Sequence, residues 1–177
     1  MTMANRGFRP GRWALALWFI SACSTAAATN NLHFSGNLVA GACTLVVQGN
    51  HLADVVFPKL SAGDLALAPS AFQPFSFQLT DCSTALSNGV RVTFSGVEAA
   101  GLAGFLALDG SSTASGVGIG IATLPGTAVA INSGNATFTL TSGNNTLNLQ
   151  ARVQAIPGAE IVPGYFSASA TATFEYL

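Results

Sequence analysis

Cysteine is the residue type in this chain best able to form a covalent bond, and cysteines stand at positions 23, 43 and 82. Cys23 falls in a segment with the features of an export leader, which leaves Cys43 and Cys82 as an even pair. An even pair in an exported protein predicts a disulfide, because the compartments that such proteins enter are oxidising. In the chain-entropy model this bond is worth about 4 kcal/mol. The alternative is a pair of free, buried thiols.

Metal binding and catalysis have weaker candidates. His33 and His51 have no second histidine or cysteine at ligand spacing, so no metal site is expected. The seven acidic residues are scattered, mostly beside turns, which is untypical of paired acid–base groups. The glycine-rich run 116–120 fails the dinucleotide-binding pattern, because residue 121 is Ile and the context is a strand. The sequence therefore predicts no catalytic residue, no metal, no cofactor and no enzymatic activity.

The first 28 residues have the organisation of a secretory signal peptide. Arginines at positions 6, 9 and 12 precede an apolar run at 13–22, and Ala26-Ala27-Ala28 fits a small-x-small cleavage site. This run is too short to span a bilayer, which needs about 20 residues. We therefore expect a leader at 1–28 and an exported protein. Lipidation at Cys23 is the alternative, because Ile20-Ser21-Ala22-Cys23 resembles a bacterial lipobox, and the sequence leaves both mature N-termini open.

The composition argues against one class of partner. Only 7% of the residues are charged, against about 25% in an ordinary soluble domain. Three of the six basic residues lie in the leader, so removal of the leader would leave three basic residues against seven acidic ones. No basic patch would remain, and binding to nucleic acid is not expected.

Residues 30–40, just before Cys43, have the period of a β-strand with one apolar side and one polar side. The polar side is formed by residues 33, 35 and 37. The apolar side is formed by Leu32, Phe34, Gly36, Leu38 and Ala40. A glycine inside a strand often marks a close backbone approach. Once the leader is removed nothing precedes this strand, so its apolar side must be buried in a sheet of this chain or of a neighbour.

The rest of the chain also alternates with a period of two. Short segments separated by turn residues predict antiparallel strands, of which 147–155 and 165–177 are the clearest. In the last strand the even-numbered residues from Phe166 to Tyr176 share the apolar side. Segment 99–108 is ambiguous, because its Ala and Leu content would allow a helix that Gly101 and Gly104 weaken. Strands at short spacing without a long helix predict an all-β antiparallel sandwich in one domain.

Six sequence features occur in a fixed order along the chain. They are the alternating segment 32–36, Ala42-Cys43, the run 77–82 that ends in Cys82, the stretch 144–152, Gly164, and the ending 170–177 with an aromatic residue at position 176. Each feature is weak alone. Together, at this spacing, they resemble the type 1 fimbrial subunits, the pilins assembled by the chaperone–usher route, and the resemblance extends over nearly the whole chain after the leader.

The resemblance implies an immunoglobulin-like antiparallel β-sandwich that lacks its final strand, at 43–177, preceded by a donor-strand arm at 29–42. In such subunits the arm of a neighbour completes the sandwich, which is a case of β-augmentation. Leu32, Phe34, Leu38 and Ala40 would then fill pockets, and Gly36 would pass a tight point of the groove. The strand that borders the groove and faces the chaperone would contain Gly164, Phe166, Ala168, Ala170, Ala172, Phe174 and Tyr176.

The resemblance also implies partners and a location. The partners would be a periplasmic pilus chaperone, an outer-membrane usher and neighbouring pilin subunits in a homopolymer or mixed fibre. The protein would pass through the periplasm to a cell-surface fimbrium and support adhesion, with any host receptor reached through the fibre. Two alternatives remain: a minor, tip or adaptor subunit with a binding role, and a self-complemented exported sandwich, which could be a lipoprotein. The sequence does not separate a major subunit from a minor one.

Overall fold

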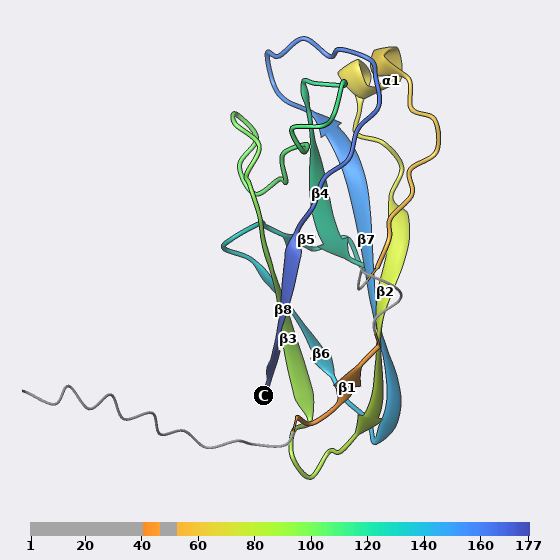
Figure 1. Ribbon diagram of the computed structural model, residues 1–177, viewed down its shortest axis with the longest axis vertical. Coiled ribbons are helices and arrows are strands. Elements are labelled where there is room, and N and C mark those ends of the chain that lie inside the picture. The colour runs from red at the N-terminus through yellow and green to blue at the C-terminus, as the bar shows by residue number, and fades with distance from the viewer. Residues whose placement is uncertain (1–40, 47–52) are drawn as a thin grey trace, which may run out of the picture. The chain divides into compact units, whose positions relative to one another are not determined.

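The computed structural model describes residues 41–46 and 53–177 (Figure 1). The expected leader at 1–28 lies outside these residues, and so do Leu32, Phe34, Gly36, Leu38 and Ala40 of the expected arm. The described part is nearly all β, as the alternating sequence predicts. It contains no helix long and apolar enough to cross a membrane.

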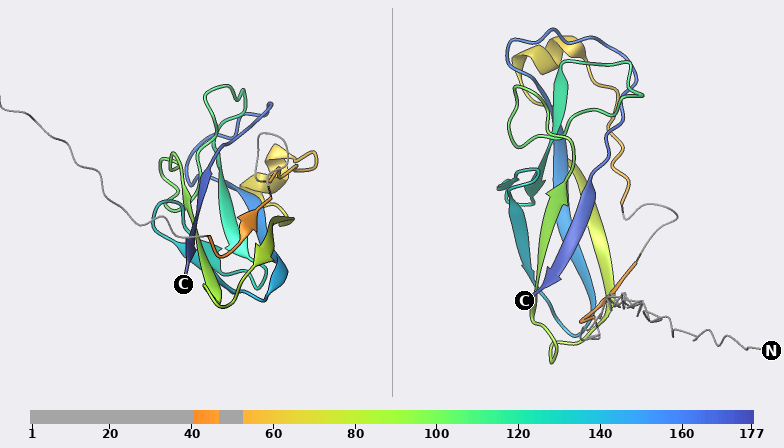
Figure 2. Two further views of the ribbon diagram at one scale, coloured as in Figure 1. Left: turned by 60° about the horizontal axis from the view of Figure 1, so that its bottom comes forward. Right: turned by 60° about the vertical axis from the view of Figure 1, so that its left-hand side comes forward.

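Two antiparallel sheets form the sandwich, and Figure 2 shows them as separate layers. The larger sheet has the order β1-β2-β7-β4-β5, in which the strands are β1 (Thr44–Leu45), β2 (Gln73–Cys82), β7 (Gly143–Ala155), β4 (Val117–Thr123) and β5 (Ala128–Val129). The smaller sheet has the order β6-β3-β8, in which the strands are β6 (Asn135–Thr139), β3 (Gly89–Ser95) and β8 (Thr171–Tyr176). Within the described residues β8 is therefore an edge strand.

The core lies between the sheets and follows the period of two. Along β7 the residues Leu147, Leu149, Ala151 and Val153 are at most 3% exposed, while the polar residues between them face outwards. Phe77 of β2 stacks on Phe94 of β3 with 6.2 Å between the ring centroids. This contact joins the larger sheet to the smaller one across the core.

Segment 99–108 forms turns rather than the helix that its composition would allow. Its Phe105 side chain lies over β4, where a Cβ at Gly120 would be 2.5 Å from Cε1 of the ring. A Cβ at Gly118 would likewise come within 3.1 Å of Ala99. The alternating glycines of the run 116–120 therefore allow a loop to pack closely on the sheet.

One short helix, α1 (Ala62–Leu67), precedes β2. Ser61 is its N-cap, and its side chain accepts a hydrogen bond from the amide of Asp64 at 3.4 Å. Leu65 is the buried residue of the helix and joins the core. Figure 1 shows α1 at the end of the sandwich opposite β1, beside the loop that connects β7 to the last segment.

Candidate strand-acceptor site

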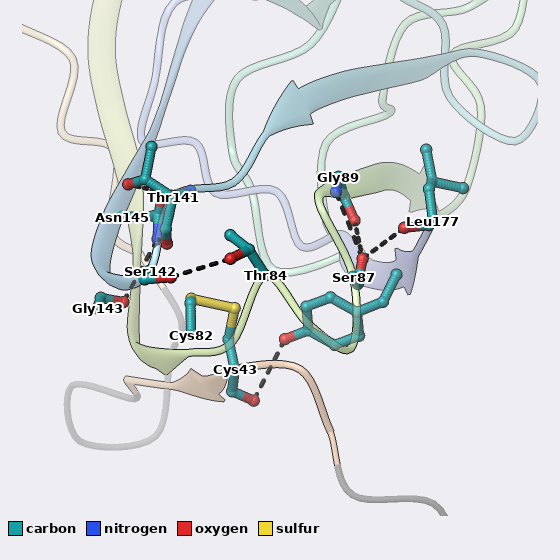
Figure 3. Close-up of a disulfide and its surroundings, with 11 residues drawn as sticks. Cys43, Cys82, Thr84, Ser87, Gly89, Thr141, Ser142, Gly143, Asn145 and Leu177 are labelled. Atoms are coloured by element: carbon teal, nitrogen blue, oxygen red, sulfur yellow. Dashed lines mark hydrogen bonds between the residues drawn. A yellow bond between two sulfur atoms is a disulfide. The ribbon is translucent and has the colours of Figure 1, made fainter.

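The disulfide predicted between Cys43 and Cys82 is present and fixes the start of the sandwich (Figure 3). β1 pairs with β2 through Thr44↔Thr80 and Leu45↔Leu79. A bulge at the end of β2, where Asp81 adopts a φ of 54°, turns the chain towards Cys82. The amide of Ser83 also donates to the carbonyl of Ala42 at 2.8 Å. Residues 41–46, which begin with the last two residues of the expected arm, are thus held at the edge of the larger sheet.

The last strand is shorter than the sequence predicts. Regular pairing with β3 extends over Thr171–Tyr176, from Ser95↔Thr171 to Val90↔Tyr176, whereas 165–170 is extended but belongs to no sheet. Beyond β8 the amide of Leu177 donates to Gly89 at 2.9 Å, and the Ser87 hydroxyl lies 2.6 Å from the Leu177 carbonyl oxygen (Figure 3). The C-terminal end of β8 is therefore fixed by the turn that precedes β3.

The apolar residues of the last segment point towards the core, as their shared parity predicts. Phe166, Ala168, Ala172, Phe174 and Tyr176 are half-buried and pack against the core, and Phe174 meets Phe77 edge-to-face at 5.1 Å. Ala170 is exposed. Gly164 is exposed as well, but a Cβ there would lie 2.6 Å from the Thr113 hydroxyl, so its role is close packing against that loop.

Residues 53–60 face this segment from the other side. Ala53, Val55 and Phe57 are half-buried and pack against the core, whereas Val56 is 83% exposed. The backbone of 53–60 makes no hydrogen bond to any other residue of the described ranges. The sequence indicated only an edge or bend here because of Pro58. The alternation from Ala53 to Phe57 was the signal for a second half-buried flank.

One aromatic contact joins the two flanks, and a hydrogen bond ties the end of β8 to the disulfide. The Phe57 and Phe166 rings lie 5.9 Å apart between centroids. The Tyr176 hydroxyl donates to the Cys43 carbonyl at 3.4 Å, a bond drawn in Figure 3, and burial raises the pKa of Tyr176 above its ordinary value of 10.0. We refer to the two flanks, 53–60 and 166–176, as the open seam.

The open seam offers unpaired backbone next to apolar side chains. Alternate residues of a strand direct their N–H and C=O groups to opposite edges. The amide of Leu177 donates to Gly89, so the backbone groups of the residues that share its parity, Thr171, Thr173 and Glu175, point towards β3. The groups of Ala172, Phe174 and Tyr176 therefore face the seam, where no strand of the described residues pairs with them. On the outer face Arg91 and Glu175 form an exposed ion pair at 2.9 Å, which contributes little to stability.

Metal binding was the other chemistry considered for the histidine, cysteine and acidic side chains. No set of three His, Cys, Asp or Glu side chains close enough to hold a metal ion occurs among the residues that the structure describes. What the open seam does contain is an unpaired strand edge beside half-buried apolar side chains.

Comparison with known proteins identifies the same family across the chain. The model of the family described as "Fimbrial protein" matches residues 32–177. The chain is 51% identical to the Escherichia coli K12 protein named "Uncharacterized fimbrial-like protein YfcP", over 94% of this chain and 96% of that protein. It is 34% identical to "Type-1 fimbrial protein, A chain" of the same organism, over 92% and 93%. The crystal structure of the P pilus rod subunit PapA shares the fold with a TM-score of 0.64 at 24% identity, covering 77% of this chain and all of that one.

Proposed function

Because the chain belongs to the fimbrial protein family and is a structural subunit of a surface fimbrium rather than an enzyme, we propose that it polymerises through its open seam. Residues 29–40 of the arm of the next subunit would enter the seam as an additional strand, while the last two residues of the expected arm, 41 and 42, stay with their own sandwich. The observation that supports this most directly is the edge of β8, which has half-buried apolar side chains and no strand on its outer side within the described residues.

The chemistry of the arm matches the seam. Backbone groups of the arm would pair with β8 and with 53–60, and the apolar side of the arm would complete the core. Burial of apolar surface contributes about 25 cal/mol per Å2, so the four apolar side chains at 32, 34, 38 and 40 are worth several kcal/mol before ordering costs. Gly36 would lie where the seam is narrowest.

The direction of pairing determines the shape of the assembly. β8 runs from the α1 end of the sandwich towards the C-terminus at the other end (Figure 1). An arm that pairs antiparallel to β8 would therefore run towards the α1 end, and its C-terminal residues would leave the seam there. The disulfide end of the donor would then sit against the α1 end of the acceptor. Such a heterologous contact repeats without closing and forms a fibre.

The same surface indicates which partners the subunit needs before it polymerises. An unpaired apolar edge aggregates unless it is covered, so the exported subunit requires a periplasmic chaperone that lends a strand to the seam. Exchange for the arm of the next subunit would take place at an outer-membrane usher. The leader at 1–28 would direct the chain to this route.

Hydrogen exchange on isolated fibres tests the proposal at single residues. The amides of Ala172, Phe174 and Tyr176 should be strongly protected in the fibre, because an arm strand pairs with them. Free exchange at these three amides, alongside protected amides at Thr173 and Glu175, would show that nothing pairs with this edge and would contradict the proposal.

A further inference from the structure

Segment 165–170 is held in an extended conformation by side chains instead of by a neighbouring strand. Three backbone amides of alternate residues donate to three side-chain oxygens of the loop 109–113. Tyr165 donates to the Thr113 hydroxyl at 2.9 Å. Ser167 donates to the Ser112 hydroxyl at 3.0 Å, and Ser169 donates to the Asp109 carboxylate at 3.1 Å. We refer to residues 109, 112 and 113 as the side-chain ladder.

The carbonyls on this edge are satisfied by the same loop. The amides of Thr113 and Ala114 both donate to the Tyr165 carbonyl, at 2.9 and 3.0 Å. The amide of Asp109 donates to the Ser167 carbonyl at 2.8 Å, and the Ser112 hydroxyl donates to it at 3.1 Å. The ladder is itself braced, since the amide of Ser112 donates to the Asp109 carbonyl at 2.9 Å. One edge of 165–169 thus has its hydrogen-bonding groups occupied much as a β-ladder would occupy them.

The opposite edge of the same segment is available. Phe166 and Ala168 are half-buried against the core, and the backbone of 166, 168 and 170 makes no hydrogen bond within the ranges that the structure describes. This edge continues without a break into the seam-facing edge of β8. The side-chain ladder therefore begins where β3 ends at Ser95, and it extends the support that β3 gives to β8 towards the α1 end.

We propose that Asp109, Ser112 and Thr113 are positioning residues for strand addition, a role that rests on the proposed function. By occupying one edge, they exclude an incoming strand from the wrong side of 165–170. By fixing the extended backbone beforehand, they remove the ordering cost that would otherwise oppose pairing there. The arm of a second copy then pairs along 166–176 and not along β8 alone. Nearly half of the acceptor edge is thus supported from behind by a loop, through three polar side chains and three backbone amides.

The test compares two triple variants assembled in cells with the chaperone and usher. The first, Asp109→Ala with Ser112→Ala and Thr113→Val, removes all three acceptors. The second, Asp109→Asn with Ser112→Thr and Thr113→Ser, keeps an acceptor at each position and should behave as wild type. Thr84→Val with Ser142→Ala removes a hydroxyl pair elsewhere, at 3.0 Å, and controls for the loss of a surface hydrogen bond.

In fibres of the first variant, the amides of Phe166, Ala168 and Ala170 should exchange about tenfold faster or more, because local opening becomes easier. The amides of Ala172, Phe174 and Tyr176 should stay protected, since β3 still supports β8. Unchanged protection at 166, 168 and 170 would overturn the positioning role. Exposed amides at 172, 174 and 176 in wild-type fibres would instead defeat the proposed function, so the two failures are distinguishable.

Single variants keep the test decisive if the first triple variant yields no fibre. Thr113→Val should increase exchange mainly at Phe166, and Asp109→Ala mainly at Ala170, because each acceptor holds the amide next to that residue. Wild-type exchange at those two amides, or a uniform increase over 166–176, would contradict a ladder that acts position by position.

Discussion

Two glycines of β4, Gly118 and Gly120, are explained by the loop residues that pack directly on them. Gly120 is the clearest case, because its missing side chain leaves room for the Phe105 ring on the face of β4. The sequence indicated that the run 116–120 does not fit the dinucleotide-binding pattern, but not why it alternates glycine with larger residues. The reason is a contact with a residue 15 positions earlier, which periodicity along a strand does not reveal.

Gly120→Val should destabilise the sandwich by about 1–3 kcal/mol, since the added carbons collide with an aromatic ring held in a packed loop. Urea denaturation measures the change in unfolding free energy. Gly110→Val is the matched control, because a Cβ there meets nothing within 4 Å. Equal stabilities for the two variants would contradict the close packing of Phe105 on β4.

Tyr176 should make stability depend on pH in the alkaline range. Burial raises its pKa in the folded state above 10.0, so the unfolded chain loses the phenol proton first. The contribution of this group is therefore complete below pH 10 and is lost as the pH rises through the folded pKa. Unfolding free energies measured across this range should fall more steeply for wild type than for Tyr176→Phe. Parallel curves would argue against burial of the phenol at the Cys43 carbonyl.

Gly36→Arg should block assembly but not export, because a long charged side chain would not fit the tight point at which Gly36 is expected to enter the seam. Asn37→Arg introduces the same charge one position later, on the polar side of the arm, and should assemble. Electron microscopy of the cell surface counts the fibres, and a blot of the periplasm checks export. Normal fibres from Gly36→Arg would refute the position assigned to this glycine.

At the scale of elements, the period of two predicted the strands well and their ends poorly. The expected strand 147–155 lies within β7 with the expected residues buried. The last strand was expected to begin at residue 165, yet β8 begins at Thr171. β3 ends at Ser95, the partner of Thr171, so residues 165–170 have no strand to pair with. The alternation of apolar and polar residues indicates which residues face the core, but it does not indicate whether a neighbouring strand is present. Segment 165–170 keeps the alternation while side chains replace the neighbour.

The candidate site was predictable to the same extent. Parity placed the apolar side of 166–176 towards the core, and the cysteine count predicted the disulfide. The opposite flank, 53–60, was not assigned to the site, because a short alternating segment with a proline suggests only an edge. The side-chain ladder could not be predicted, since it depends on how the loop 109–113 folds back.

The inward aromatic residues of β8 should decide whether the subunit survives in the periplasm. Phe174→Ser with Tyr176→Ser removes the contact with Phe77 and the bond to Cys43, and it weakens the apolar surface offered to a chaperone strand. We expect the periplasmic level to fall strongly, because an unprotected edge aggregates or is degraded. Thr171→Ser with Thr173→Ser alters exposed positions of the same strand and should leave the level unchanged. Similar levels for both pairs would contradict the account of β8.

At the scale of the whole molecule, the proposed assembly gives the two ends of the sandwich different tasks. The disulfide end holds 41–46 and thereby the root of the arm, while the open seam extends along the body towards α1. An arm of 29–40 spans about 40 Å when extended, at about 3.3 Å per residue. That length matches a strand laid along the whole of 166–176. In the proposed assembly donor and acceptor functions would therefore occupy separate surfaces, as a non-closing fibre requires.

The most direct test of arm-mediated assembly is an SDS gel of fibres sheared from cells that also express the chaperone and usher. Unheated wild-type material should form a ladder at monomer spacing that collapses to a single band on boiling, because strand addition is strong but not covalent. Deletion of 30–40 should abolish the ladder while the monomer still reaches the periplasm. A ladder that persists without these residues, or a single monomer band from unheated wild-type fibres, would contradict the account.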